Sequence, residues 1–268
     1  MLSLSGDHTA LTSVQRCWQL LRVVGPRKTA GVLVSLLDDQ YLRTFDRRYR
    51  VRTSGLILLA STSFDPARLR DATQYGPVNA WAFRHLLKEL NLPRKLHFVD
   101  LGCGLGRPCL LAAEYGFEKV TGVDLARELC ELARENAAQW RFRAAHSTPI
   151  AILQMDALDF CENSDDDVFF MFRPFSKEFL ERILEKLAGV AARQKKQLII
   201  IYSERMAHAT SHRDAIAGHS GFEQIHESGA YGQAFYVYRS APLSKSEVAA
   251  ERRALAKPES SRSNVNRG

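Results

Sequence analysis

The stretch from Phe98 to Gly106 constrains the fold more than any other part of this sequence. It reads Phe-Val-Asp-Leu-Gly-Cys-Gly-Leu-Gly, an apolar run of the buried-strand type that ends in three glycines at alternate positions. Glycine turns tightly and lets a backbone approach a ligand without a Cβ atom in the way. In open α/β folds such a loop lies at the carboxyl edge of the strands, where ligands bind. The stretch therefore predicts an α/β fold with a ligand site at this loop.

The chain after Pro93 alternates between predicted strands and helices. Two further strands come last, and the short link between them, residues 229–232, suits an antiparallel pair. The pattern predicts a doubly wound, seven-stranded, mostly parallel sheet that ends in an antiparallel pair. The predicted strands are residues 96–101, 119–123, 150–155, 168–172, 198–202, 222–226 and 234–239.

Three segments differ in character along the chain. Residues 1–92 contain apolar residues at helical spacing, at 9–24, 32–41 and 78–90, and we expect an N-terminal helical cap that covers the site. Residues 93–241 form the predicted Rossmann-like, ligand-binding domain. Residues 242–268 are basic and nearly free of large apolar side chains, so they cannot offset their ordering entropy and are predicted to be disordered.

Composition limits the compartment and the class of protein. The 268 residues are 46% hydrophobic, which suffices for one sizeable core. There is no apolar run of transmembrane length and no secretory signal. The five cysteines lack Cys-x-x-Cys spacing, so neither a disulfide framework nor a zinc knuckle fits. We expect a cytoplasmic protein without a structural metal.

The net charge of +7 is unevenly distributed, with arginines at 43, 47, 48, 50 and 52 and a basic tail. Such a charge attracts anions, whether acidic metabolites, nucleic acid or a lipid surface. The arginines are not interleaved with aromatic residues as in known nucleic-acid modules. A basic surface that serves solubility is the alternative interpretation.

Two acidic residues accompany the glycine loop. Asp100 stands two residues before the first glycine, and Asp124 follows the next predicted strand, 20 residues beyond Gly104. A carboxylate at the position of Asp124 can accept hydrogen bonds from both hydroxyls of a ribose. The rival ligand is a dinucleotide, but its fingerprint requires glycine at position 107, which is Arg107 here. Asp100 suits a ligand with an ammonium group rather than a pyrophosphate.

The glycine loop and the stretch Gly-Val-Asp-Leu at 122–125 resemble motifs I and II of class I S-adenosylmethionine-dependent methyltransferases. The resemblance covers roughly residues 75–239 and implies S-adenosylmethionine as the cofactor. It places Asp100 near the methionine amino group, Asp124 at the ribose and Asp156 at the adenine amino group. The full set of implied cofactor-binding residues is Tyr75, Asp100, Gly102, Cys103, Gly104, Gly106, Asp124, Leu125, Asp156 and Ala157. A Rossmann-like domain that has lost its cofactor is the alternative, which the intact glycines and acids do not favour.

The loop after the fourth predicted strand is the usual acceptor side of this family. Nucleic-acid amino methyltransferases often carry Asn or Asp there, followed by prolines and an aromatic residue. This chain has Phe172-Arg173-Pro174-Phe175, and an arginine cannot accept a hydrogen bond from an amine. Arg173 therefore suggests a substrate carboxylate or phosphate gripped bidentately. Pairing with a local acid, Asp165 or Asp166, is the alternative.

Methyl transfer from a sulfonium is an in-line displacement, so positioning of the acceptor supplies much of the rate. A base is needed only if the acceptor carries a proton. Tyr202 and Glu204, at the expected end of the fifth strand, are the candidate bases, although they could simply be solvated. His208 and His212 have helical metal-pair spacing, but no third ligand accompanies them, so no metal is predicted.

Together these features predict a methyltransferase that acts on a small, anionic acceptor. A protein or nucleic-acid methyltransferase that docks its substrate through the basic stretch and tail is the first alternative. A non-catalytic S-adenosylmethionine-binding protein is the second. The acceptor atom and the oligomeric state are not specified by the sequence.

Overall fold

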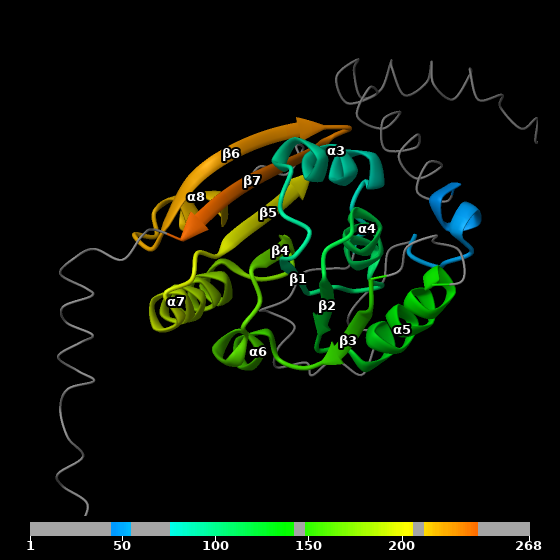
Figure 1. Ribbon diagram of the computed structural model, residues 1–268, viewed down its shortest axis with the longest axis horizontal. Helices are drawn as coiled ribbons and strands as arrows, with labels where there is room; N and C mark the ends of the chain where they lie inside the picture. Colours follow the sequence, from blue (N-terminus) through cyan, green and yellow to red (C-terminus); the bar gives the residue numbers. More distant parts are fainter. Residues whose placement is uncertain (1–43, 55–75, 142–147, 206–211, 241–268) are drawn as a thin grey trace, which may run out of the picture.

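The computed structural model describes residues 44–54, 76–141, 148–205 and 212–240. Their centre is a seven-stranded sheet in the order β3-β2-β1-β4-β5-β7-β6 (Figure 1). Strands β1 to β5 are parallel, whereas β7 is antiparallel to both β5 and β6, so the predicted fold class is confirmed. The strands are β1 His97–Leu101, β2 Lys119–Asp124, β3 Ile150–Gln154, β4 Val168–Phe172, β5 Ile199–Arg205, β6 Phe222–Ala230 and β7 Gln233–Ser240.

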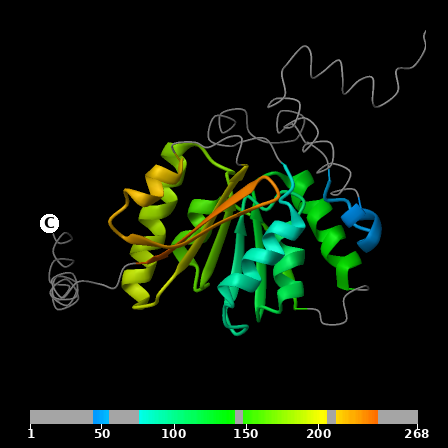
Figure 2. The same ribbon diagram turned by 90° about the horizontal axis from the view of Figure 1, so that it is seen from above.

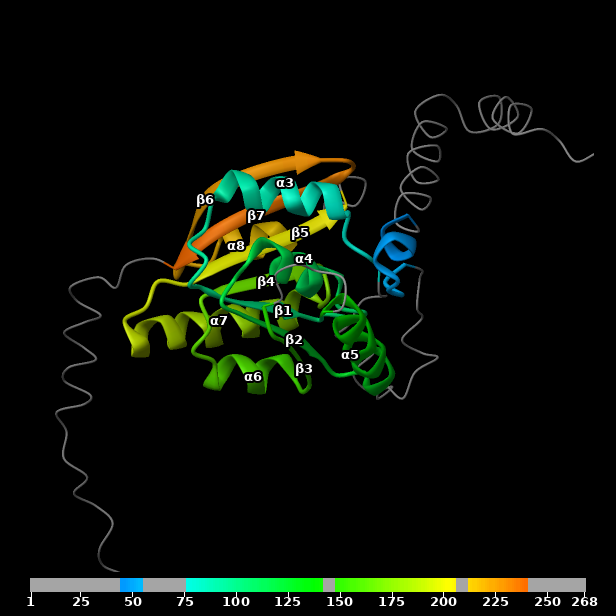
Figure 3. The same cartoon turned by 45° about the vertical axis from the view of Figure 1, so that its right-hand side comes forward.

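Helices cover both faces of the sheet, as Figure 2 shows. On one face lie α3 (Ala80–Leu90), α4 (Arg107–Tyr115) and α5 (Arg127–Arg141). On the other lie α6 (Ala157–Asn163), α7 (Lys177–Gln194) and α8 (His212–Ala217). Helix α3 crosses the antiparallel end of the sheet (Figure 3), where Ser228 Oγ of β6 donates to Glu89 at 2.8 Å.

Helices α3 and α7 begin where a side chain accepts hydrogen bonds from their first N–H groups. Asn79 accepts from Trp81 N and Ala82 N at the start of α3. Ser176 accepts from Phe179 N at 3.3 Å and caps the start of α7.

The core of the first face joins the N-terminal residues to the sheet. The Phe83 ring of α3 meets the Phe170 ring of β4 edge-on at 4.9 Å between centroids. Phe45 and Val51 are buried in the same cluster. The described part of residues 1–92 therefore shares one core with the sheet, and its role as a cap stays a prediction.

The sequence analysis missed one helix and ended two strands too early. Strand β6 continues to Ala230, four residues past its predicted end. Helix α6 has seven residues, of which three are charged or amide side chains, so no apolar periodicity indicated it. Strand β5 continues to Arg205, three residues past the predicted end, because its ladder with β7 extends to the pair Arg205–Gln233. That pairing partner lies 28 residues away along the chain and leaves no local pattern.

Several predicted segments lie outside the described residues, namely the helices at 9–24 and 32–41 and the tail at 242–268. None of the helices in the described part of the chain is long and apolar enough to cross a membrane.

Candidate functional site at the carboxyl edge of the sheet

The glycine loop connects the end of β1 to the start of α4. The N–H groups of Gly102 and Cys103 donate to the Val123 carbonyl at 2.8 and 3.0 Å, which fixes the loop beside the end of β2. Gly102, Gly104 and Gly106 have φ values of 75°, 53° and 81°. This left-handed region is costly for residues with a Cβ atom, so the spacing of the glycines follows from the shape of the loop.

Asp124 ends β2 and points into the loop. Its Oδ2 accepts from Gly104 N and its Oδ1 accepts from Ala126 N, both at 2.9 Å. Each carboxylate oxygen has more than one acceptor site, so the same carboxylate can also receive the two hydroxyls of a ribose. Burial raises the pKa of Asp124, and the N–H bonds to it act in the opposite direction. Leu125, the next residue, is partly exposed.

Asp100 is a buried acid in β1, with 1% of its surface exposed. Cys109 Sγ lies 3.7 Å from its Oδ2. Burial, followed by the nearby charge of Asp124, raises the pKa of Asp100 well above its usual range. A ligand ammonium group would stabilise the ionised form of this carboxyl. The residues present therefore fit a ligand that combines an ammonium group with a ribose.

The third acid, Asp156, follows the neighbouring strand β3. Gln154 of β3 pairs with Asp124 in the sheet, and Asp156 follows two residues later. Its Oδ1 accepts from Leu158 N at 2.8 Å, so Asp156 also caps α6, with Ala157 as the first helical residue. The structure thus brings the ends of β1, β2 and β3 together at one edge, whereas Tyr75 lies outside the described residues.

The acceptor-side loop packs directly on the first glycine. A Cβ atom added to Gly102 would lie 2.4 Å from the Pro174 Cβ atom. The loop after β4 and the glycine loop therefore form adjoining walls of one site.

Gly102→Ala is expected to destabilise the fold by about 2–4 kcal/mol, from the left-handed φ and the overlap with Pro174. S-adenosylmethionine affinity should fall as well, because the loop must shift to relieve the overlap. Gly76→Ala is the matched control, since a Cβ atom there meets nothing within 4 Å. Urea unfolding and calorimetric titration measure both effects. Equal results for the two variants would contradict the packing described.

Arg173 directly follows β4 and lies beside Glu204 of β5, because their predecessors Phe172 and Ser203 are paired in the sheet. Arg173 has φ 41°, an uncommon value for a residue with a side chain. Asp165 and Asp166 precede β4, which separates them from Arg173 by roughly 16 Å of extended chain. Pairing of Arg173 with either acid is thereby excluded.

His212 joins this side of the site, although the sequence analysis considered it only as a metal ligand. Its ring bonds to the Phe175 backbone and interacts electrostatically with Arg173 and Glu204. Burial, and then the positive charge of Arg173, lower the pKa of His212. Tyr202 and Glu204 both lie inside β5 with 1% of their surface exposed, so neither is simply solvated, and Tyr202 belongs to the core of the second face.

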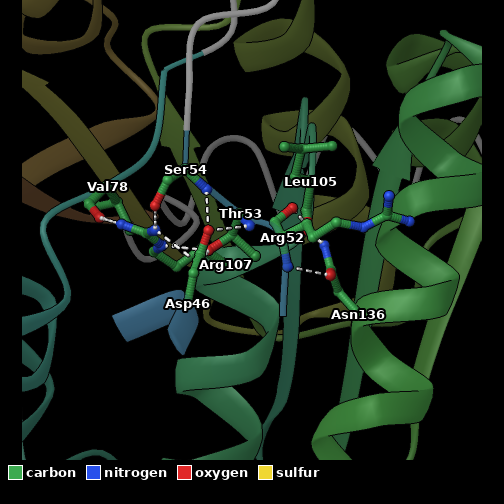
Figure 4. A network of polar contacts seen from close by, with 8 residues as sticks. All are labelled: Asp46, Arg52, Thr53, Ser54, Val78, Leu105, Arg107 and Asn136. Atoms are coloured by element: carbon green, nitrogen blue, oxygen red, sulfur yellow. Dashed lines mark hydrogen bonds and ion pairs between the residues drawn. The ribbon is translucent and has the colours of Figure 1, made fainter. Parts of the chain in front are cut away.

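The structure gives Arg107 an anchoring role that the sequence did not indicate. The sequence analysis used it only to exclude a dinucleotide, but its side chain is fully buried and anchors the N-terminal residues (Figure 4). The guanidinium donates to Thr53 Oγ1 at 2.7 Å, Ser54 Oγ at 3.0 Å and the Val78 carbonyl at 3.2 Å. The Asp46 carboxylate lies 3.2 Å away and neutralises it.

A potential metal-ligand group among the described residues lies at the opposite edge of the sheet. The ligand atoms of His97, Asp165 and Asp166 lie within 4.8 Å of one another. The ammonium group of Lys119 is 3.1 Å from Asp166 Oδ1 and already supplies a cation there. This cluster is separate from the glycine loop.

Comparisons with known proteins agree with this site. The family described as Methyltransferase domain matches residues 98–194. The provisionally named methyltransferase YqeM of Bacillus subtilis is 40% identical over 68 residues, which are 25% of this chain and 24% of that relative. The chain thus matches about a quarter of this curated relative's length.

Solved structures resemble the chain at the level of the fold. The provisionally assigned RNA methyltransferase PH1948 from Pyrococcus horikoshii is 16% identical, with a TM-score of 0.51 over 73% of this chain and 96% of that one. Magnesium protoporphyrin IX methyltransferase from Synechocystis, solved with bound S-adenosylmethionine, is 16% identical, with a TM-score of 0.47 over 78% and 97%.

The sheet order and the glycine-loop site define a Rossmann-like methyltransferase fold. The family match identifies a methyltransferase domain at residues 98–194, and S-adenosylmethionine is the cofactor of that domain.

Proposed function

We propose that this protein transfers a methyl group from S-adenosylmethionine to a small acceptor that carries a carboxylate or phosphate. The position of Arg173 is the observation that carries the proposal. It follows β4, beside the Pro174 contact with Gly102, so a substrate anion held by its guanidinium would lie next to the cofactor loop. The amine-binding Asn or Asp of nucleic-acid methyltransferases is replaced by a residue that only donates hydrogen bonds.

The residues of the chain bind, orient and exclude water in this reaction. S-adenosylmethionine supplies an activated methyl group on a sulfonium. The glycine loop gives its backbone a close approach, with Asp100 at the ammonium group, Asp124 at the ribose and Asp156 at the adenine. Holding an acceptor in line with the methyl group can lower the barrier by several kcal/mol, about 7–11 in favourable model reactions.

An acceptor with a proton also needs a base. Glu204 and Tyr202 are the proposed candidates, and both are buried. Glu204 has the better position because it lies beside Arg173 in the register of the sheet and interacts with His212. Tyr202 is enclosed by the core. The carboxylate of Glu204 can take the proton directly or through the imidazole of His212. The lowered pKa of His212 favours its neutral form, which can accept a proton.

Arg173→Gln is expected to raise the KM for an anionic acceptor by about tenfold or more, with little change in S-adenosylmethionine affinity. Labelled methyl transfer to a panel of small carboxylates, phosphates and matched neutral analogues measures this effect. Arg193→Gln is the control, because Arg193 lies near the far end of α7 and donates to the Glu162 carbonyl. Equal use of anionic and neutral acceptors by the unaltered protein would refute the proposed substrate class.

A macromolecular substrate is the second candidate. The observation that favours it is the exposure of Arg47, Arg48, Arg50 and Arg52 in the described part of the basic stretch. Substrate binding would then weaken steeply as salt rises, whereas a small acceptor gives a shallow dependence.

Cofactor binding without transfer to any acceptor would support the non-catalytic alternative. A cytoplasmic location remains part of the proposal.

A further inference from the structure

Residues 44–54, here called the N-terminal strap, are joined to the chain on both sides of Gly106. Before this glycine, Asn136 of α5 donates its amide N–H to the carbonyls of Leu105 and Arg52, both at 3.0 Å. Its Oδ1 accepts from Arg52 N at 2.7 Å. After this glycine comes Arg107, which bonds to Thr53 and Ser54 (Figure 4).

The anchored residue is a glycine, and its backbone is therefore flexible unless its neighbours are held in place. Gly106 has φ 81° and joins the glycine loop to α4. Glycine loses more conformational entropy than any other residue when it is ordered. Fixing both of its neighbours orders this junction before a ligand arrives, which lowers the cost of binding.

The anchor is a buried charge network and therefore has few acceptable geometries. Asp46 Oδ2 accepts from Thr53 N at 2.8 Å and from Ser54 N at 2.7 Å, and its Oδ1 lies 3.2 Å from the Arg107 guanidinium. The Phe45 ring centroid is 4.8 Å from the same guanidinium. A buried polar network is stabilising only when its members are satisfied together, so the strap is docked as a unit.

We infer that the strap and the cofactor loop are energetically coupled, with Arg107 and Asn136 as positioning residues between them. Docking of the strap stabilises the ligand-ready loop. By linkage, a ligand at the loop must then stabilise the docked strap by the same free energy. The inference rests on S-adenosylmethionine as the cofactor and is independent of the proposed acceptor.

Hydrogen exchange of the full chain, with and without saturating S-adenosylhomocysteine, tests this reciprocity. The reporters are the amides of Val51, Thr53 and Ser54, all of which donate to Asp46. We expect their exchange to slow by about fivefold or more on binding, while β6 (residues 222–230) is unchanged. Protection of residues 101–107 without any change in the strap would overturn the coupling.

Ser54→Ala separates coupling through the anchor from direct ligand contact. It removes one hydrogen bond to Arg107 from a partly exposed residue, so the fold should persist. The Kd for S-adenosylhomocysteine should rise about two- to tenfold, and the ligand-induced protection of the strap should shrink. Ser228→Ala, which removes a similar bond to Glu89, should leave the Kd unchanged. A lowered Tm with an unchanged Kd in Ser54→Ala would show a purely structural role and refute the inference.

These measurements use no acceptor. Failure of the coupling can therefore be told apart from failure of the proposed methyl transfer. Arg107→Lys supplies a further check, since it keeps the charge but loses the planar fork of donors. It should weaken S-adenosylhomocysteine binding more than Ser54→Ala does. An affinity equal to that of the unaltered protein would contradict the positioning role of Arg107.

Discussion

Asp124→Ala is expected to weaken S-adenosylmethionine binding by at least about 100-fold, because hydrogen bonds to a charged acceptor contribute about 1.5–3 kcal/mol each. The carboxylate has two tasks. It holds the loop through Gly104 N and Ala126 N, and it is the acceptor placed for the ribose hydroxyls. Its removal therefore costs both loop geometry and direct ligand bonds. Calorimetric titration with S-adenosylmethionine, S-adenosylhomocysteine and NAD measures the loss.

Asp165→Ala is the matched control for this variant. Asp165 is an exposed acid at the opposite edge of the sheet, where it faces Lys119. Its replacement should leave cofactor affinity unchanged. Retained micromolar binding by Asp124→Ala, or binding of NAD alone by the unaltered protein, would be incompatible with the cofactor site described.

Asp46→Ala is expected to destabilise the protein by about 3–5 kcal/mol, because it leaves the buried Arg107 guanidinium without its neutralising carboxylate. The N–H groups of Thr53 and Ser54 lose their acceptor at the same time. The double variant Asp46→Ala/Arg107→Met should be more stable than Asp46→Ala alone, since the buried charge is then absent. Urea unfolding of both single variants and the double variant completes the cycle.

Arg52→Met controls for the loss of an arginine in the same strap. Its guanidinium pairs with Glu135 at the surface, with 71% and 60% of the two side chains exposed, while its backbone makes the contacts to Asn136. Such exposed pairs contribute less than about 1 kcal/mol. If Asp46→Ala and Arg52→Met were equally mild, or if the double variant were strictly additive, the buried network could not have the role assigned to it.

The fold and the shape of the glycine loop were predictable because their signals are local, whereas the cofactor-binding roles stay a prediction. The glycines at 102, 104 and 106 and the acid at 124 mark sharp turns at strand ends, and each turn requires particular residues within a few positions. The same reasoning placed the terminal strand pair, because its link is short.

The remaining features depend on contacts between distant parts of the chain. Arg107 and Asp46 are 61 residues apart, and neither lies in a pattern that indicates a partner. His212 belongs to the site only because α8 returns to the ends of β4 and β5. The buried position of Tyr202 follows from a strand that is longer than its apolar run, because β7 extends the ladder. Periodicity reports which face of an element is apolar, but not which element covers it.

The strap also bears on where this protein can be divided. A fragment that starts at residue 93, or where the family match starts at residue 98, would lack Phe45, Val51 and α3 from its core. It would also expose the buried Arg107 guanidinium to water, together with the apolar residues that the strap and α3 cover. We therefore expect a fragment that begins upstream of Phe45 to be more stable than one that begins at residue 93, because the matched segment is shorter than the core that supports it.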